Sequence, residues 1–255
     1  MGAVGFPGHQ REGLLRAWGH LAIRASRRTI VRVQTPETKD IWQLLTGFPD
    51  PQQPFITTNF ADGGRIELSL TTFTNGAAKA ANALRDLLDV EPGALVRVDL
   101  GWSWQQSIWQ AATLISGAQL VSANADIAIV AAAQVSEASA GFDGEVYGVS
   151  TDVWGRPQGC EGEITAEVLG QPDSWMYPEY FASHGALVEQ ALQWGEDHGV
   201  TAKDRIGIDS GHILPNLLIP FVLPLVFSGS VVLTDHLDEN LIAQEQITCK
   251  LLRSS

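Results

Sequence analysis

The sequence predicts an α/β fold in which parallel sheets are flanked by helices, and three observations support this prediction. The order helix, strand, helix, strand occurs twice along the chain, as parallel crossover units require. The candidate strands are short, rich in β-branched residues and almost continuously apolar, which is typical of strands covered on both faces. The candidate helices each carry one apolar stripe, which is typical of helices that pack on a sheet.

The two copies of this unit can be aligned residue by residue. Val96 in the first candidate strand and Ile206 in its counterpart are 110 positions apart. The glycines that follow the second helix of each copy, Gly117 and Gly229, are 112 positions apart, so the offset changes by only two residues. We therefore expect two similar helix-strand-helix-strand units.

A short helix and a hairpin are predicted before the first copy. Thr38 to Leu45 has an amphipathic pattern and is followed by a proline-rich turn. Two alternating segments, Phe55 to Thr58 and Arg65 to Leu68, flank an Asp-Gly-Gly turn, which predicts antiparallel strands. Ser69 is a suitable N-cap for the helix predicted over Ser69 to Asp89.

The remaining elements follow from the same signals. In the second copy a helix is predicted from Ser183 to His198, and Gly199 stands where a left-handed residue commonly ends a helix. The other predicted strands are Val96 to Leu100, Gln119 to Ser122, Ile127 to Ala131, Arg205 to Asp209 and Ser230 to Leu233; a helix over Asp238 to Gln246 and a strand over Ile247 to Leu252 follow them.

Composition divides the chain into four regions. Residues 1–37 form a basic arm with six arginines, which we expect to be disordered or an extension of the domain. Residues 38–140 hold the first α/β unit and residues 179–255 the second. Residues 141–178 are rich in Gly, Pro, Asp and Glu, and we expect a long loop that is either functional or poorly ordered. Residues 38–255 are expected to form one domain.

The formal net charge of −13 excludes some partners. The arm alone would suit a nucleic-acid, lipid or transit segment, but the rest of the chain is strongly acidic and repels nucleic acid and anionic lipid. Cys160 and Cys249 form no metal-binding or disulfide pattern, so we expect a reducing cytoplasm and no metal. Gly211 to Thr234 lacks charge but contains three prolines, which favours a buried helix and strand over a membrane span.

Three motifs carry a resemblance to a known family. Ile66 to Leu70 resembles a Leu-Ser-Tyr signature, Val90 to Val96 resembles V-x-P-G-D-x-V, and Ser116 to Val121 resembles A-G-A-x-x-V. These motifs are similar to the N-terminal part of the AMP-forming adenylate ligases, the superfamily of acyl-CoA synthetases. The span from about Thr38 to Leu252 also resembles a set of short actinobacterial proteins that contain only this N-terminal portion.

The resemblance implies a position for a nucleotide loop. The family's phosphate-binding loop reads T-S-G-T-T-G-x-P-K-G, and the corresponding segment here is Ser150 to Gly159. The candidate nucleotide-binding residues that this segment keeps are Gly155, Pro157 and Gly159. Asp152 replaces a glycine, and Gln158 replaces the lysine that neutralises the phosphates. A carboxylate repels a triphosphate, so we expect a degenerate loop.

Few other residues suggest chemistry. His212 lies within about one residue of a histidine that the family places beside its acyl group, which makes it the acyl-pocket candidate, with an ordinary loop histidine as the alternative. Ser210 follows a strand but lacks the first glycine of G-x-S-x-G, which argues against a hydrolase. Three tryptophans at near-helical spacing line either a ligand groove or the core: Trp102, Trp104 and Trp109.

The resemblance therefore implies a catalytically silent relative of the ligases. In full-length relatives the adenine and ribose contacts and the C-terminal catalytic domain lie beyond position 255. We expect a binding or assembly domain without a cofactor, with a homo-oligomer or a protein partner covering an exposed apolar face. As an alternative, an acyl or adenylate pocket that takes ATP, AMP or CoA is completed by a separate chain. A membrane-associated protein is the third hypothesis.

Overall fold

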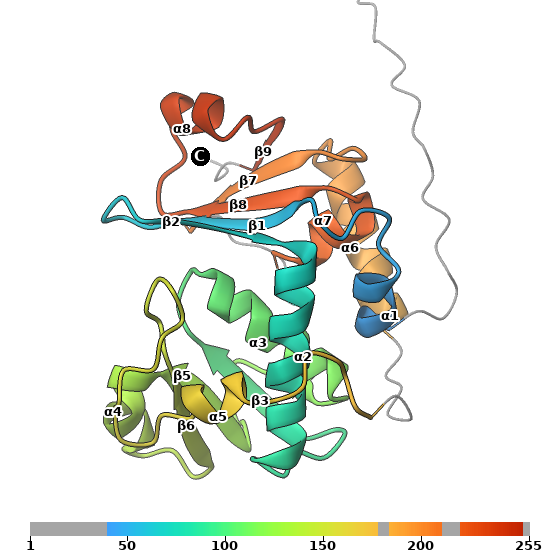
Figure 1. Cartoon of the computed structure of the whole chain (residues 1–255). Helices are drawn as coiled ribbons and strands as arrows, with labels where there is room; N and C mark the ends of the chain where they lie inside the picture. Colours follow the sequence, from blue (N-terminus) through green and yellow to red (C-terminus); the bar gives the residue numbers. More distant parts are fainter. Residues whose placement is uncertain (1–39, 178–183, 211–219, 252–255) are drawn as a thin grey trace, which may run out of the picture. The chain divides into compact units, whose positions relative to one another are not determined.

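The computed structural model describes residues 40–177, 184–210 and 220–251, all of which lie in one structural unit of residues 32–255. Its strands form two sheets (Figure 1). The five-stranded sheet has the order β2-β1-β8-β7-β9, and the four-stranded sheet has the order β4-β3-β5-β6. The basic arm and His212 lie outside the described residues.

In the five-stranded sheet only the predicted hairpin is antiparallel. Its strands are β1 (Pro54–Asn59), β2 (Arg65–Ser69), β7 (Arg205–Asp209), β8 (Ser230–Thr234) and β9 (Cys249–Leu251). β1 pairs antiparallel with β2, whereas β1 with β8, β8 with β7, and β7 with β9 are parallel pairs. The four-stranded sheet is entirely parallel: β3 (Leu95–Asp99), β4 (Gln119–Leu120), β5 (Ile127–Ala131) and β6 (Glu145–Val149). The predicted fold class is confirmed.

The two predicted copies form equivalent strand pairs, with one correction to the offset. β3 pairs with β4 at Leu95 and Gln119, and β7 pairs with β8 at Arg205 and Ser230. The second strand of each copy is therefore offset by 111 residues instead of the 112 inferred from the glycines. The backbone explains the difference, because the left-handed residue that corresponds to Gly117 is Ser228 and not Gly229.

Helix α2 (Leu70–Asp86) connects the two sheets. The side chain of Ser69 accepts a hydrogen bond from the backbone N–H of Thr72, as its predicted N-cap role requires. Figure 1 shows α2 leaving the end of β2 and running alongside α3 (Trp104–Ile115). The other helices are α1 (Ile41–Thr46), the short η1 (Ala132–Gln134) and α4 (Val135–Ser139), α5 (Thr165–Leu169), α6 (Gly185–Asp197), α7 (Val222–Phe227) and α8 (Glu239–Gln244).

The segment predicted as a long loop contains regular structure. Strand β6 and helix α5 both lie within residues 141–178. Lys79 on α2 donates hydrogen bonds to the backbone oxygens of Leu169 and Gln171, and the amide of Asn82 donates to Pro172 and Ser174. These contacts join positions about 90 residues apart in sequence, so no local pattern could reveal them.

A continuous apolar core holds the elements together. The buried rings of Phe55, Phe73 and Phe221 follow one another with centroid distances of 5.0 and 5.6 Å, which links β1, α2 and the start of α7. His184 is buried at the N-terminus of α6, where its Nδ1 accepts a hydrogen bond from the backbone N–H of Ile41. Within the described residues, no helix is both long enough and apolar enough to cross a bilayer.

Candidate functional site

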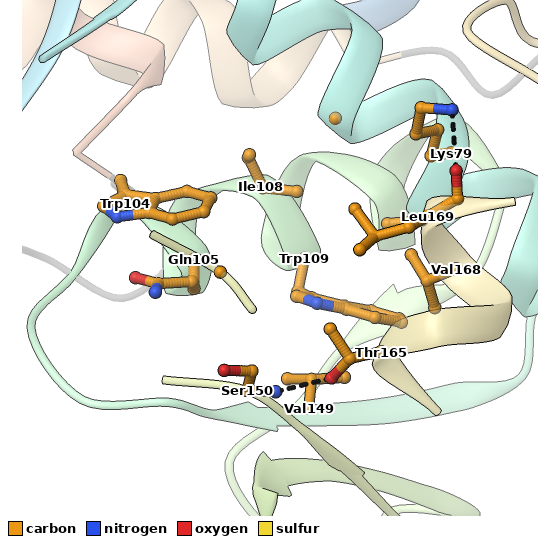
Figure 2. Close-up of a pocket in the computed structure, with 13 residues that line it drawn as sticks. Lys79, Trp104, Gln105, Ile108, Trp109, Val149, Ser150, Thr165, Val168 and Leu169 are labelled. Atoms are coloured by element: carbon orange, nitrogen blue, oxygen red, sulfur yellow. Dashed lines mark hydrogen bonds between the residues drawn. The ribbon is translucent and has the colours of Figure 1, made fainter. Parts of the chain in front are cut away.

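A pocket lies where three helices meet the end of β6 and the loop that follows it (Figure 2). Each helix presents residues spaced three or four apart, which places them on one face of the helix. α2 contributes Gly76 and Lys79, and α3 contributes Trp104, Ile108 and Trp109. Val168 and its neighbours on α5 line the opposite side. The space open to water-sized molecules is about 100 Å³, and most of its wall is apolar.

Two glycines allow the pocket wall to close tightly. A Cβ atom added to Gly76 would lie 2.7 Å from Cδ1 of Ile108, so this glycine lets α2 and α3 approach each other. Gly155 has a φ of +67°, and an added Cβ there would lie 3.1 Å from Cη2 of Trp104. Gly155 is therefore used for a left-handed turn and for packing against an indole ring.

The polar groups of the pocket are few. Nε2 of Gln105 donates a hydrogen bond of 2.8 Å to the backbone oxygen of Asp152, which ties α3 to the loop. Oε1 of Gln105 and Nε1 of Trp104 are buried and have no hydrogen-bond partner among the described residues. Lys79 also forms a 2.8 Å ion pair with Asp173, so its ammonium group already contacts three oxygens.

The loop after β6 uses its own carboxylates to bind its backbone N–H groups. Oδ1 of Asp152 accepts hydrogen bonds from the N–H groups of Trp154, at 2.9 Å, and Arg156, at 3.3 Å. The carboxylate of Glu163 accepts from the N–H of Gln158, at 2.9 and 3.0 Å, and from the N–H of Cys160, at 3.1 Å. In a phosphate-binding loop such N–H groups point at the ligand.

Electrostatics agree with this arrangement. Partial burial raises the pKa of the Glu163 carboxyl, but hydrogen bonds from the Thr165 hydroxyl and from the backbone of Gln158, Cys160 and Gly159 outweigh it, so the pKa lies below its usual value. The Thr165 hydroxyl donates at 2.7 Å and itself accepts from the N–H of Ser150 at 2.8 Å. Glu163 is therefore a resident anion in this loop.

The predicted site residues separate into three groups. Gly155 lines the pocket, whereas Pro157 and Gly159 are exposed and do not line it. Trp104 and Trp109 line the pocket, and Trp102 packs against the apolar core. Sequence reasoning missed Glu163, which lies outside the motif, four residues after Gly159. Among the described residues no group of three or more His, Cys, Asp or Glu side chains is placed to hold a metal.

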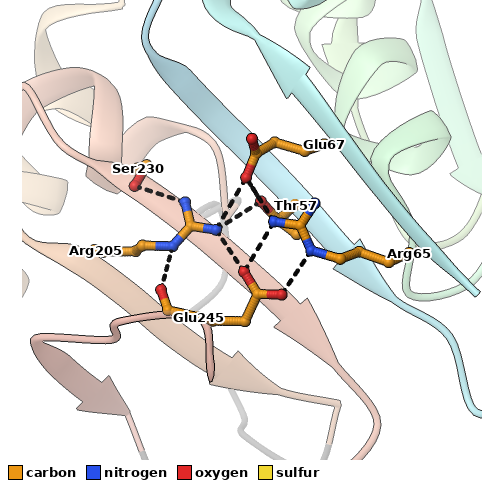
Figure 3. A network of polar contacts seen from close by, with 6 residues as sticks. All are labelled: Thr57, Arg65, Glu67, Arg205, Ser230 and Glu245. Atoms are coloured by element: carbon orange, nitrogen blue, oxygen red, sulfur yellow. Dashed lines mark hydrogen bonds and ion pairs between the residues drawn. The ribbon is translucent and has the colours of Figure 1, made fainter. Parts of the chain in front are cut away.

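A second polar cluster lies on the five-stranded sheet, on the side where Figure 1 shows α8 (Figure 3). Glu245 follows α8 and accepts hydrogen bonds of 2.7 Å from Arg65 on β2 and from Arg205 on β7. Glu67 accepts from the same two guanidinium groups at 2.7 and 3.1 Å. Two positive and two negative charges balance, and the Glu245 side chain is only 3% exposed.

The two guanidinium groups lower the pKa of the Glu245 carboxyl. The hydrogen bond from Arg65 lowers the pKa most, burial raises it, and the bond from Arg205 lowers it further, to about 2. The cluster links β2, β7 and the end of α8 through charge-assisted hydrogen bonds. It contains no unbalanced charge with which to bind a charged ligand, so its role is to hold the sheet and α8 together.

Comparison with solved structures identifies the fold. An acyl-CoA synthetase from Brucella canis superposes with a TM-score of 0.65 and 14% identity over 84% of this chain. The N-terminal domain of FACL13 from Mycobacterium tuberculosis superposes with a TM-score of 0.60 and 14% identity over 82% of this chain. The chain covers 47% of the first protein and 61% of the second, so it spans about half the length of the synthetase. At these identities the likeness is one of fold alone.

Comparison with known sequences identifies the family. No protein-family model matches the chain. A protein of Mycobacterium tuberculosis (strain ATCC 25618 / H37Rv) named "TIGR03089 family protein" is 32% identical over 223 residues, which cover 80% of this chain and 92% of that protein. This identity extends over nearly the whole relative, and the fold is that of the N-terminal part of acyl-CoA synthetases. The chain therefore belongs to the TIGR03089 family.

Proposed function

We propose that this chain is a binding or assembly domain that does not form acyl-adenylates by itself. The observation that carries the proposal is the occupation of the loop after β6 by carboxylates of the chain itself. Glu163 accepts hydrogen bonds from the N–H groups of Gln158 and Cys160, and Asp152 accepts from those of Trp154 and Arg156.

A triphosphate would meet two costs in this loop. It would have to displace Glu163 from backbone N–H groups, and it would then lie among carboxylates that repel it. Each charge-assisted hydrogen bond that is lost costs about 1.5 to 3 kcal/mol, so the loss of two reduces affinity by at least about a hundredfold. Gln158 supplies no compensating positive charge in the place where the family has lysine.

The test is ATP–pyrophosphate exchange with a panel of carboxylic acids, together with the thermal stability of the protein with and without ATP. We expect no exchange above the background and no rise in Tm at millimolar ATP, because stabilisation requires binding to the folded state. Exchange by the purified chain, or a Tm that rises with ATP concentration, would overturn the proposal.

A second candidate function is favoured by the pocket beside the loop. An acyl-binding or adenylate-binding chain that is completed by a separate polypeptide would need a cavity at the position of the degenerate loop, and the pocket beside Gly155 supplies one. Exchange assays on the chain purified together with any protein that copurifies with it distinguish the two candidates. Activity that appears only in the complex would favour the second candidate over the first.

We also propose that the assembly role involves self-association or a protein partner in a reducing compartment such as the cytoplasm. Trp154, Leu169 and Met176 are large apolar side chains that are each more than half exposed, so they are available for contact with a partner surface. Both cysteines are free thiols, which suits a reducing compartment. Light scattering on the purified chain tests self-association, and a monomer at all concentrations with no copurifying protein would contradict the assembly role.

A further inference from the structure

We propose that the pocket between α2, α3, α5 and the loop after β6 binds a small neutral molecule through one ring-sized apolar group. This inference deepens the binding role proposed above and rests on it. Three properties of the pocket carry it: its size and wall, the inaccessibility of the two buried polar atoms beside it, and the sign of the charges around it.

The size and the wall set the apolar part of the ligand. The space of about 100 Å³ is several times what one water needs, and an apolar cavity of roughly 150 Å³ in another protein is known to take a benzene molecule. Figure 2 shows the indole of Trp104 at one end of the pocket and that of Trp109 further along α3, with Ile108 between them. A single aromatic ring or a branched alkyl group of similar size fits this wall.

Two buried polar atoms beside the pocket offer a ligand no hydrogen bond. Nε1 of Trp104 is a donor and Oε1 of Gln105 is an acceptor; neither has a partner among the described residues, and each has almost no accessible surface. The orientation of the Gln105 amide is fixed, because its Nε2 donates to the backbone oxygen of Asp152. Figure 2 shows both residues at the same end of the pocket. Because neither atom is accessible from the pocket, a ligand gains no hydrogen bond from them, and its apolar group supplies the binding energy.

The surrounding charges select a neutral ligand. Lys79 is the only charged residue among those that line the pocket, and its ammonium group already contacts Leu169, Gln171 and Asp173. The adjoining loop carries the carboxylates of Asp152 and Glu163. An anionic ligand would find no free cation in the wall and would be repelled by the loop.

The experiment is a ligand titration of the full chain followed by nuclear magnetic resonance. Benzamide and benzyl alcohol are the neutral probes, benzoate is the anion of nearly the same shape as benzamide, and ATP is the nucleotide probe. We expect both neutral probes to bind with a Kd at or below about 1 mM and benzoate to bind at least about tenfold more weakly. Intermolecular contacts should connect the probe protons with the indole rings of Trp104 and Trp109.

A matched pair of variants places the binding. Val168 lines the pocket and is half-buried, and Val121 is half-buried but does not line it. Val168→Trp should weaken benzamide binding at least about tenfold because it fills the pocket, and Val121→Trp should leave the Kd unchanged. Circular dichroism and Tm establish that both variants fold, and the contacts to Trp104 and Trp109 in the wild type provide the same localisation without any substitution.

The outcomes separate this inference from the proposed function. Equal binding of benzoate and benzamide, no neutral binding at all, or probe contacts elsewhere on the chain would each overturn the inference. Those results would leave the binding or assembly role standing as long as ATP also failed to bind. Binding of ATP would overturn the proposed function as well, whatever the neutral probes did.

Discussion

Two glutamates in this molecule accept hydrogen bonds in very different environments. Glu245 is almost fully buried and accepts hydrogen bonds from two guanidinium groups that come from β2 and β7. Glu163 is half-buried and accepts from backbone N–H groups within five residues of it and from one hydroxyl. The first carboxylate joins distant parts of the chain, whereas the second closes a local loop.

The difference is that the same charge neutralises guanidinium groups in one place and occupies backbone N–H donors in the other. At Glu245 the carboxylate neutralises two cations that would otherwise be left in a poorly solvated site, so its removal affects the folded state strongly. At Glu163 water reaches the carboxylate, so its hydrogen bonds contribute little net stability. What Glu163 does instead is occupy donors that an external anion would need.

The largest expected effect is that of Glu245→Gln. The pKa of about 2, against an ordinary value of 4.5, corresponds to about 3 kcal/mol of stabilisation at neutral pH. We expect the variant to lose about this much free energy of unfolding in urea denaturation. Glu239→Gln on the same helix is the control, because Glu239 is 85% exposed and its ion pair with Lys250 should contribute less than about 1 kcal/mol.

The acid dependence of stability gives a second test of the ion pairs of Glu245. Because the pKa of Glu245 is lower in the folded state, its contribution is complete above about pH 4.5 and is lost as the pH falls toward 2. Glu245→Gln should therefore flatten the fall in unfolding free energy across this window. An unchanged acid dependence would mean that the carboxylate at the end of α8 does not form its buried ion pairs in solution.

Most of the fold could be predicted because it rests on local signals. The hairpin follows from alternation around Gly63 and Gly64, and the start of α2 follows from its Ser69 cap. Strand β6 was not predicted, because Glu145 to Val149 lies in a segment of loop-like composition and its stability comes from pairing with β5. Tertiary contact overrode composition there.

The candidate site was predictable only in part. The motif match singled out Gly155, which lines the pocket, and marked Asp152 as unfavourable for phosphate. It could not reveal that Trp104 fills the space next to Gly155, because the contact joins two segments about 50 residues apart. Nor could it reveal Glu163 as the acceptor, since a glutamate outside the motif has no fixed place until the loop folds back.

The next effect in size is that of Gly155→Ala, which tests whether the loop after β6 depends on packing against Trp104. Both Gly155 and Gly159 have positive φ, but an added Cβ meets the Trp104 ring only at Gly155 and meets nothing within 4 Å at Gly159. A left-handed alanine costs about 1 kcal/mol. We expect Gly159→Ala to lose about 1 kcal/mol of unfolding free energy and Gly155→Ala to lose about 2 kcal/mol. Equal losses would show that the indole contact is not formed.

The smallest effect on stability is expected for Glu163→Ala. The same substitution is expected to create anion binding. Its hydrogen bonds are partly solvated, so we expect a loss below about 1 kcal/mol in the free energy of unfolding. The N–H groups of Gln158 and Cys160 would then be free to donate hydrogen bonds to an external anion. Inorganic pyrophosphate should therefore bind the variant measurably in isothermal titration calorimetry, with affinity that weakens as salt is added.

Glu161→Ala is the matched control. Glu161 is an exposed glutamate two residues from Glu163, and its replacement removes the same charge from the same loop. If the loss of charge alone were sufficient, both variants would bind pyrophosphate equally. If Glu163 excludes anions by occupying the backbone donors, only Glu163→Ala gains binding, and the wild type and the Glu161 variant remain unresponsive. Equal gains in the two variants would reduce Glu163 to one of several surface charges, and its contrast with Glu245 would then be one of burial alone.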